Sequence, residues 1–96
     1  MRHYRTHEEY LDKKLKDPIE AALYLNAAIE ENDPKLLIAA LADVARAYGI
    51  SHLARKITIS RVGLHKSLSK KGNPQLKTFM NLIKATGLQM TFKKAA

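Results

Sequence analysis

The sequence predicts an all-α domain of five helices that is followed by one short C-terminal strand. Two Asp-Pro pairs, at residues 17–18 and 33–34, are strong helix-start signals. Leucine, isoleucine and alanine recur with helical spacing over most of the chain, and aromatic residues make up only 6% of it, which favours close helix packing. Only after Gly87 does the pattern change to the period-two alternation of a strand.

Length and composition set the expected domain organisation. A chain of 96 residues is long enough for one hydrophobic core, so we expect one domain. Residues 1–16 are polar and only weakly periodic, and we interpret them as an N-terminal arm that could contain a short turn around Glu9 to Leu15. The folded domain is expected over residues 17–96.

The first two expected helices follow the two Asp-Pro pairs. Asp17 is a capping acid, Pro18 takes the first helical position and Glu20 can reach back to the cap, so a helix should run to about Glu31. Its apolar stripe, which should pack on another element, consists of Ile19, Leu23, Asn26 and Ala27, widened by Ala22, Leu25 and Ile29. The helix expected from Lys35 to Tyr48 is apolar over most of its circumference and should form the centre of the core.

Three further helices and a strand are expected in the second half. Ser51 should cap a helix that ends near Ile57, and Ser60 should cap one that ends near Leu68. Asn73-Pro74 should begin a fifth helix that ends at Gly87. The segment 88–92 alternates apolar and polar residues, so it should either pair as a strand with its copy in a second subunit or lie extended on the core.

Charge is distributed very unevenly along the chain. The first 48 residues contain 7 basic and 9 acidic residues, whereas the rest contains 10 basic residues and no acid, which together give the net charge of +8. The last acidic residue is Asp43. A solvated face usually mixes both signs, whereas a face that binds phosphates excludes carboxylates, so the second half is expected to hold a polyanion.

The segment from Ile50 to Leu68 predicts two short helices that are joined by a tight turn. This compact arrangement is typical of a helix-turn-helix that binds DNA. Ala54 suits the point where the helices cross. The apolar residues expected to lock the two helices together are Leu53, Ile57, Ile59 and Leu64, with Leu68 at the end of the second helix. The expected outer face of the second helix consists of Ser60, Arg61, Val62, His65 and Lys66.

Each residue type on this face has a suitable role in binding DNA. Arg61 can donate two hydrogen bonds to guanine, Val62 can contact a thymine methyl group, and His65 or Lys66 can reach a base edge or a phosphate. We expect phosphate contacts from further residues nearby, namely Ser51, Lys70, Lys71 and Asn73.

Several classes of function are not expected. The chain has no cysteine, no glycine-rich phosphate loop and no acid near the histidines of its second half, so we expect no metal site, no cofactor and no enzyme. The longest apolar run, Leu36 to Ala42, is far shorter than the ~20 residues that a membrane span requires. We therefore expect a cytoplasmic protein.

The spaced motifs together resemble a known family. They are Asp17-Pro18-Ile19-Glu20, Asp33-Pro34, Ala45-Arg46-Ala47-Tyr48-Gly49-Ile50, Leu53-Ala54-Arg55, the run from Ser60 to Lys66, and Gly72-Asn73-Pro74. Over residues 9 to 92 the chain resembles the small addiction-module antidote proteins, which are HigA-like antitoxins with a Cro/phage-repressor-like helix-turn-helix domain.

The resemblance implies a bacterial toxin–antitoxin module. Such an antitoxin binds and neutralises a small RelE/ParE-like (HigB-like) toxin, typically an RNA-cutting one, and as a dimer represses its own operator, where it is associated with the nucleoid. It also implies that DNA is contacted by the recognition-helix residues named above, and we expect a homodimer that could form through Leu88–Phe92. The chain departs from the family in two respects. Thr58 stands where the turn usually has glycine, and the first helix of the pair is expected to begin close to Leu53, so it is shorter at its start than in typical phage repressors.

Two other functions agree with the same residues. One is a transcription regulator of the same fold that has no toxin partner. The other is a basic protein that binds RNA or a membrane surface, which would need no sequence specificity from Arg61.

Overall fold

A computed structural model describes the backbone of residues 2–96 and the side chains of residues 7–96, so Met1 of the expected arm lies outside the described residues. Six helices follow one another, α1 (Arg2–Leu15), α2 (Pro18–Glu30), α3 (Pro34–Tyr48), α4 (Ile50–Lys56), α5 (Arg61–Ser67) and α6 (Leu76–Ala85). The all-α class is confirmed, but the described residues form six helices rather than five and contain no strand. No single helix in this part of the chain is long and apolar enough to cross a membrane.

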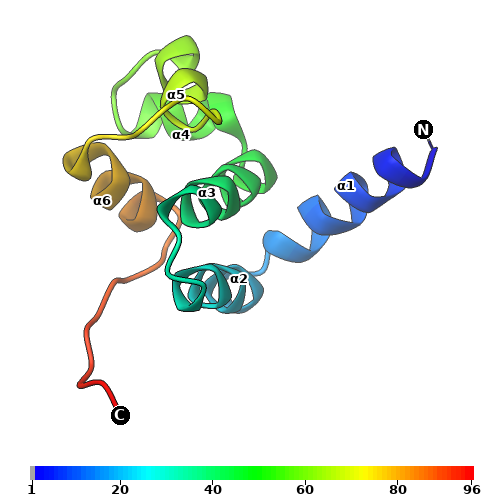
Figure 1. The fold of residues 1–96 in the computed structure, drawn as a ribbon. Helices are drawn as coiled ribbons and strands as arrows, with labels where there is room; N and C mark the ends of the chain where they lie inside the picture. Colours follow the sequence, from blue (N-terminus) through cyan, green and yellow to red (C-terminus); the bar gives the residue numbers. More distant parts are fainter. Residues whose placement is uncertain (1) are drawn as a thin grey trace.

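The segment that we interpreted as a polar arm is the helix α1, which reaches away from the rest of the molecule at its N-terminal end (Figure 1). Among its described side chains, Leu15 is buried and Leu11 is partly buried against the core. Asp12 binds Arg46 of α3 in the same region. Apolar residues are sparse in this segment, so the helical period is weak in the sequence.

The start of α2 is as predicted, but its inner face is not. The Asp17 carboxylate accepts a 3.0 Å hydrogen bond from the Ile19 amide. Ala21 and Leu25 are the buried residues of this helix, whereas Ile19 and Leu23 of the predicted stripe are exposed. Because apolar side chains surround α2, the sequence pattern alone does not select the buried face.

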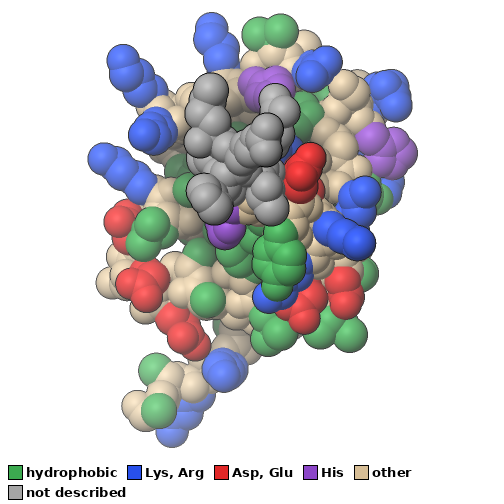
Figure 2. Space-filling model, turned by 90° about the vertical axis from the view of Figure 1, so that its right-hand side faces the viewer, with side chains coloured by type: hydrophobic (Ala, Val, Ile, Leu, Met, Phe, Trp, Pro, Cys, Tyr) green, Lys and Arg blue, Asp and Glu red, His purple; other side chains and the backbone are tan. Residues whose placement is uncertain are grey.

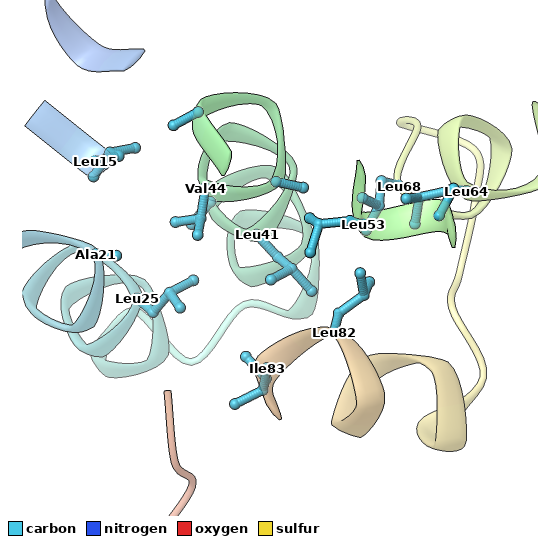
Figure 3. Close-up of a cluster of buried hydrophobic side chains, with 14 residues drawn as sticks. Leu15, Ala21, Leu25, Leu41, Val44, Leu53, Leu64, Leu68, Leu82 and Ile83 are labelled. Carbon is cyan, nitrogen blue, oxygen red and sulfur yellow. The ribbon is translucent and has the colours of Figure 1, made fainter. Parts of the chain in front are cut away.

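Helix α3 is the centre of the core, as the sequence predicts. The Asp33 carboxylate accepts a 3.0 Å hydrogen bond from the Lys35 amide at its start. The helices α1, α2 and α4 all pack on α3. In Figure 3, Leu41 and Val44 lie between the side chains from α1 and α2 and those from α4, α5 and α6. The core is therefore continuous from the N-terminal helices to the C-terminal ones.

The starts of α4 and α6 differ from the prediction. Gly49, with φ of 116°, ends α3 and is also the N-cap of α4, since its carbonyl accepts a 2.9 Å hydrogen bond from the Leu53 amide. Ser51 therefore lies in the first turn of α4 and does not cap it. Helix α6 is preceded by Gln75 as N-cap, so Asn73-Pro74 belongs to the connection before it. Unlike Asp17 and Asp33, Asn73 therefore does not cap a helix.

The predicted strand at Leu88–Phe92 is wrong. Gly87, with φ of 83°, ends the helical segment as expected, and the Leu88 amide donates a 3.1 Å hydrogen bond to the Ile83 carbonyl. Residues 88–96 then have no regular secondary structure, and Phe92 is 98% exposed. A strand needs the backbone of a second strand, and the described residues offer none.

Candidate nucleic-acid interface

The candidate interface is the pair formed by α4 and α5, which residues 57–60 connect. Leu53 of α4 and Leu64 of α5 are fully buried, and Ala54 is buried as well. Ile57 and Ile59 of the connection pack against the same core while remaining partly exposed. The apolar residues that were predicted to lock the two helices together are therefore all in the core or against it.

The connection between the helices passes through a left-handed residue. Thr58 has φ of 62°, and it is followed by Ile59, whose amide donates a 3.0 Å hydrogen bond to the Ala54 carbonyl. The Thr58 amide donates to the Arg55 carbonyl over 3.3 Å. These two bonds form a Schellman motif, in which glycine is the usual residue at the left-handed position. Thr58 thus lies inside the turn, in a conformation that is unfavourable for a β-branched side chain.

Ser60 fixes the start of α5, as the sequence predicts. Its hydroxyl oxygen accepts a 2.9 Å hydrogen bond from the Gly63 amide, and its backbone is extended. This cap places Arg61 and Val62 in the first turn of α5. In a recognition helix the first turn approaches the base edges most closely, so the cap positions these two side chains for that contact.

The outer face of α5 is composed of the predicted residues. Arg61, His65 and Lys66 are exposed, and Val62 is 69% exposed. These four residues have the spacing i, i+1, i+4 and i+5, which is one face of a helix. Leu64, on the opposite side, is buried. The fold thus brings one guanidinium, one imidazole, one ammonium group and one small apolar side chain together on a protruding surface.

The connection that follows α5 folds back over the C-terminal end of this helix. Gly72 comes so close that a Cβ atom there would lie 2.0 Å from the Lys66 carbonyl oxygen. Lys70, Lys71 and Asn73 of the same connection line a groove of about 770 Å³, whose other side is formed by α3. Lys70 and Lys71 are exposed beside α5, so the structure brings them next to the predicted DNA-reading face.

The two predicted phosphate binders that were assigned to helix starts have different positions. Ser51 is partly buried within the first turn of α4, where its amide points toward the start of a helix of seven residues. Asn73 is exposed, but it precedes the N-cap of α6 by two residues. Ser51 therefore lies at a helix start, as predicted, whereas Asn73 does not.

The salt bridges of the described side chains are confined to the first half of the chain. All salt bridges among the described side chains involve residues up to Arg46, and none involves a lysine or arginine of the basic half. In Figure 2, most acidic side chains lie in the lower half of the view, at the height of α2, whereas many lysines and arginines lie at the top. The basic half contains no carboxylate, although Asp43 of α3 lines the groove that Lys70 and Lys71 also line.

One cluster near the interface was not predicted. The rings of Tyr48 and His52 stack with centroids 5.5 Å apart, and the Lys56 ammonium donates 3.0 Å hydrogen bonds to the Tyr48 hydroxyl and the Ala85 carbonyl. The cluster joins α3, α4 and α6 and so braces the helix pair against the core. The four-residue spacing from Tyr48 to His52 to Lys56 is the only sequence signal that could have indicated it.

These features define a small all-helical protein with an acidic, apolar first half and a basic second half. Residues 6–94 match the family model described as "Probable addiction module antidote protein", and the chain belongs to this family. A relative from Haemophilus influenzae, named "Uncharacterized protein", is 43% identical over 76 residues, which cover 79% of this chain and 78% of the relative. No solved structure matches the chain. Membership confirms the antitoxin resemblance and implies a toxin partner.

Proposed function

We propose that this antitoxin neutralises a RelE/ParE-like (HigB-like) toxin and also represses its own operon by binding operator DNA as a homodimer. Family membership supports the toxin partnership. The DNA-binding part of the proposal is carried by one observation, the exposed basic face of α5 in a half of the chain that contains no carboxylate.

In this proposal α4 and α5 are a helix-turn-helix, with α5 in the major groove. Arg61 donates two hydrogen bonds to a guanine, and Val62 contacts a neighbouring methyl group. Lys66, Lys70 and Lys71 bind phosphates, which fixes the register of α5 on the duplex but does not specify sequence. The chain acts by binding rather than by catalysis, in the bacterial cytoplasm and on the nucleoid.

The homodimer follows from the requirement for two recognition helices. A palindromic operator with half-sites about 34 Å apart needs a two-fold arrangement of two α5 helices on one face of the DNA. The exposed apolar side chains of Met90 and Phe92 make the segment after Gly87 a suitable place for contact between the two subunits.

The experiment that tests DNA recognition is fluorescence anisotropy with the DNA upstream of the gene and with a scrambled duplex of equal length, over a series of salt concentrations. We expect a preference of ~10³ or more for the upstream DNA, which Arg61→Ala largely removes. Lys77→Ala is a matched control, because it removes one exposed cation from α6 and leaves α5 unchanged. Equal binding of both duplexes would show only an electrostatic surface and would contradict the proposed recognition helix.

The toxin partnership is tested separately by co-expression with the adjacent reading frame. We expect that the neighbouring protein stops growth when it is produced alone and that this chain restores growth. If the upstream DNA is bound specifically but the neighbouring protein has no such effect, the chain is a transcription regulator without a toxin partner.

A further inference from the structure

The outer face of α2 is apolar and has no partner in the described structure. Ile19 is 70% exposed and Leu23 is 59% exposed, and the two residues are one turn apart on this face. Ala21 and Leu25, on the opposite side, already anchor α2 to the core. A helix that is apolar on both sides normally has both sides covered, so this face is expected to be buried by another molecule.

Acidic residues surround this apolar face. The segment from Asp17 to Asp33 contains five acidic residues and no lysine or arginine, although the whole chain has a net charge of +8. The five are Asp17, Glu20, Glu30, Glu31 and Asp33. Among them only Glu20 has an ion-pair partner in the described structure, Lys14, at 3.7 Å and on the surface. Asp17 and Asp33 cap α2 and α3 and Glu20 pairs with Lys14, so the negative rim of this apolar face is formed mainly by Glu30 and Glu31.

We propose that the outer face of α2 is the docking site for the toxin and that the toxin presents a basic rim around an apolar centre. This inference rests on the proposed function. A toxin that cuts RNA needs cations to hold phosphates, and the carboxylates around α2 can bind the same cations in place of RNA. The apolar centre contributes affinity, and the charged rim contributes orientation and association rate.

The charge of the rim argues against the other occupants of this face. In a two-fold contact between two copies, each acidic rim would meet an identical rim, and like charges would oppose each other. DNA and anionic membrane surfaces are repelled for the same reason. A basic protein is the occupant that removes both the exposed apolar surface and the uncompensated charge.

The test is the affinity of the protein encoded by the adjacent reading frame for the full chain and its variants, measured by biolayer interferometry. We expect Ile19→Gln with Leu23→Gln to weaken binding at least about tenfold. Leu76→Gln with Met80→Gln is the matched control, because these residues of α6 are also one turn apart and are 71% and 50% exposed. The control should change the affinity less than about twofold.

The charge of the rim is tested with a second pair of variants. Glu30→Lys with Glu31→Lys should slow association and reduce its salt dependence. Glu8→Lys with Glu9→Lys changes the net charge of the chain by the same amount on α1 and should have a much smaller effect. All four variants should bind upstream DNA at least as tightly as wild type does, which separates this surface from α5.

Three results would overturn the inference. If wild type does not bind the neighbouring protein, the proposed toxin partnership and the docking site both fail. If wild type binds it and the α2 variants bind equally well, the partnership stands and the toxin uses another surface. If Ile19→Gln with Leu23→Gln changes the oligomeric state in analytical ultracentrifugation, the occupant of the face is a second copy of the chain.

Discussion

The Arg46 guanidinium donates a 2.7 Å hydrogen bond from Nε to Oδ1 of Asp12, which ties α1 to the central helix α3. Nη1 of the same side chain donates to Oδ1 of Asp43 over 3.1 Å. Burial alone would lower the pKa of Arg46, but the two carboxylates outweigh this effect and raise the pKa above its ordinary value. The ion pair is thus a polar link between the first helix and the core.

Asp12→Ala should lower the free energy of unfolding by about 0.5–1 kcal/mol, because the pair is partly exposed and water screens it. Urea denaturation followed by circular dichroism measures this change. Glu9→Ala on the same helix removes an exposed acid and is the control. Equal effects of the two substitutions would mean that the ion pair contributes nothing specific.

The hydroxyl of Tyr24 joins the same network, since it donates a 2.6 Å hydrogen bond to Oδ2 of Asp43. Tyr24→Phe removes this hydrogen bond and should cost about 1 kcal/mol at neutral pH. Tyr10→Phe is the control, because Tyr10 is exposed on α1. Thermal denaturation of both variants at pH 7 measures the difference.

The ionisation of Tyr24 should make the stability of the protein depend on pH. The pKa of Tyr24 is raised from an ordinary value of 10.0 to about 12. Burial is the largest cause, and the hydrogen bond to Asp43 and the negative charge of Asp43 add to it. Between these two values the unfolded chain has lost the phenolic proton while the folded chain retains it. Stability from Tyr24 is therefore complete below pH 10 and declines as the pH rises toward 12. We expect Tyr24→Phe to reduce this decline, and an identical decline in both proteins would contradict the assignment.

Thr58→Gly should stabilise the protein by about 0.5–1 kcal/mol. The left-handed backbone at Thr58 costs a β-branched residue about 1–2 kcal/mol, and the extra freedom of glycine in the unfolded chain offsets part of the gain. Asn32, with φ of 56°, provides a comparison, since asparagine tolerates this conformation and Asn32→Gly should gain less. Chemical denaturation of the two variants decides whether the turn is strained.

Much of this fold was predictable because several local signals agree with the tertiary structure. The two Asp-Pro pairs cap α2 and α3, Ser60 caps α5, and Gly87 ends the segment of α6. Each of these signals acts through backbone hydrogen bonds of neighbouring residues, so no distant contact is needed to interpret it. The outer residues of α5 were predictable for the same reason, because a capped helix with Leu64 inside leaves only one face outside.

The starts of α4 and α6 were misplaced locally, by two residues, whereas the other errors concern features that depend on distant partners. The sequence does not show that Ala21 rather than Ile19 meets α3, because both sides of α2 are apolar. It does not show that Asp12 meets Arg46, which is 34 residues away. The alternation in residues 88–92 suggested a strand, but alternation describes the two faces of a strand and does not provide the second strand.

Gly72→Ala should destabilise the protein by at least about 1 kcal/mol and weaken DNA binding. The added Cβ would overlap the backbone carbonyl of Lys66, which cannot rotate away, so the connection carrying Lys70 and Lys71 must move. Gly63→Ala is a comparison with a smaller expected cost, because its Cβ would lie 2.9 Å from the Ser60 hydroxyl, which caps α5 but belongs to a side chain that can shift. Wild-type stability in Gly72→Ala would show that the connection adapts without cost.

Removing the charge of Lys66 should change the salt dependence of DNA binding more than removing the charge of Lys56, although both are exposed lysines of the helix pair. The Lys56 ammonium is held by the Tyr48 hydroxyl and the Ala85 carbonyl, whereas Lys66 lies on the outer face of α5. If Lys66 binds one phosphate, Lys66→Gln reduces the slope of log affinity against log salt by about 0.9, and Lys56→Gln leaves it nearly unchanged. Anisotropy with upstream DNA at several salt concentrations gives both slopes. A larger change in slope for Lys56→Gln would contradict this prediction. It would mean that the DNA phosphates contact α4 rather than α5.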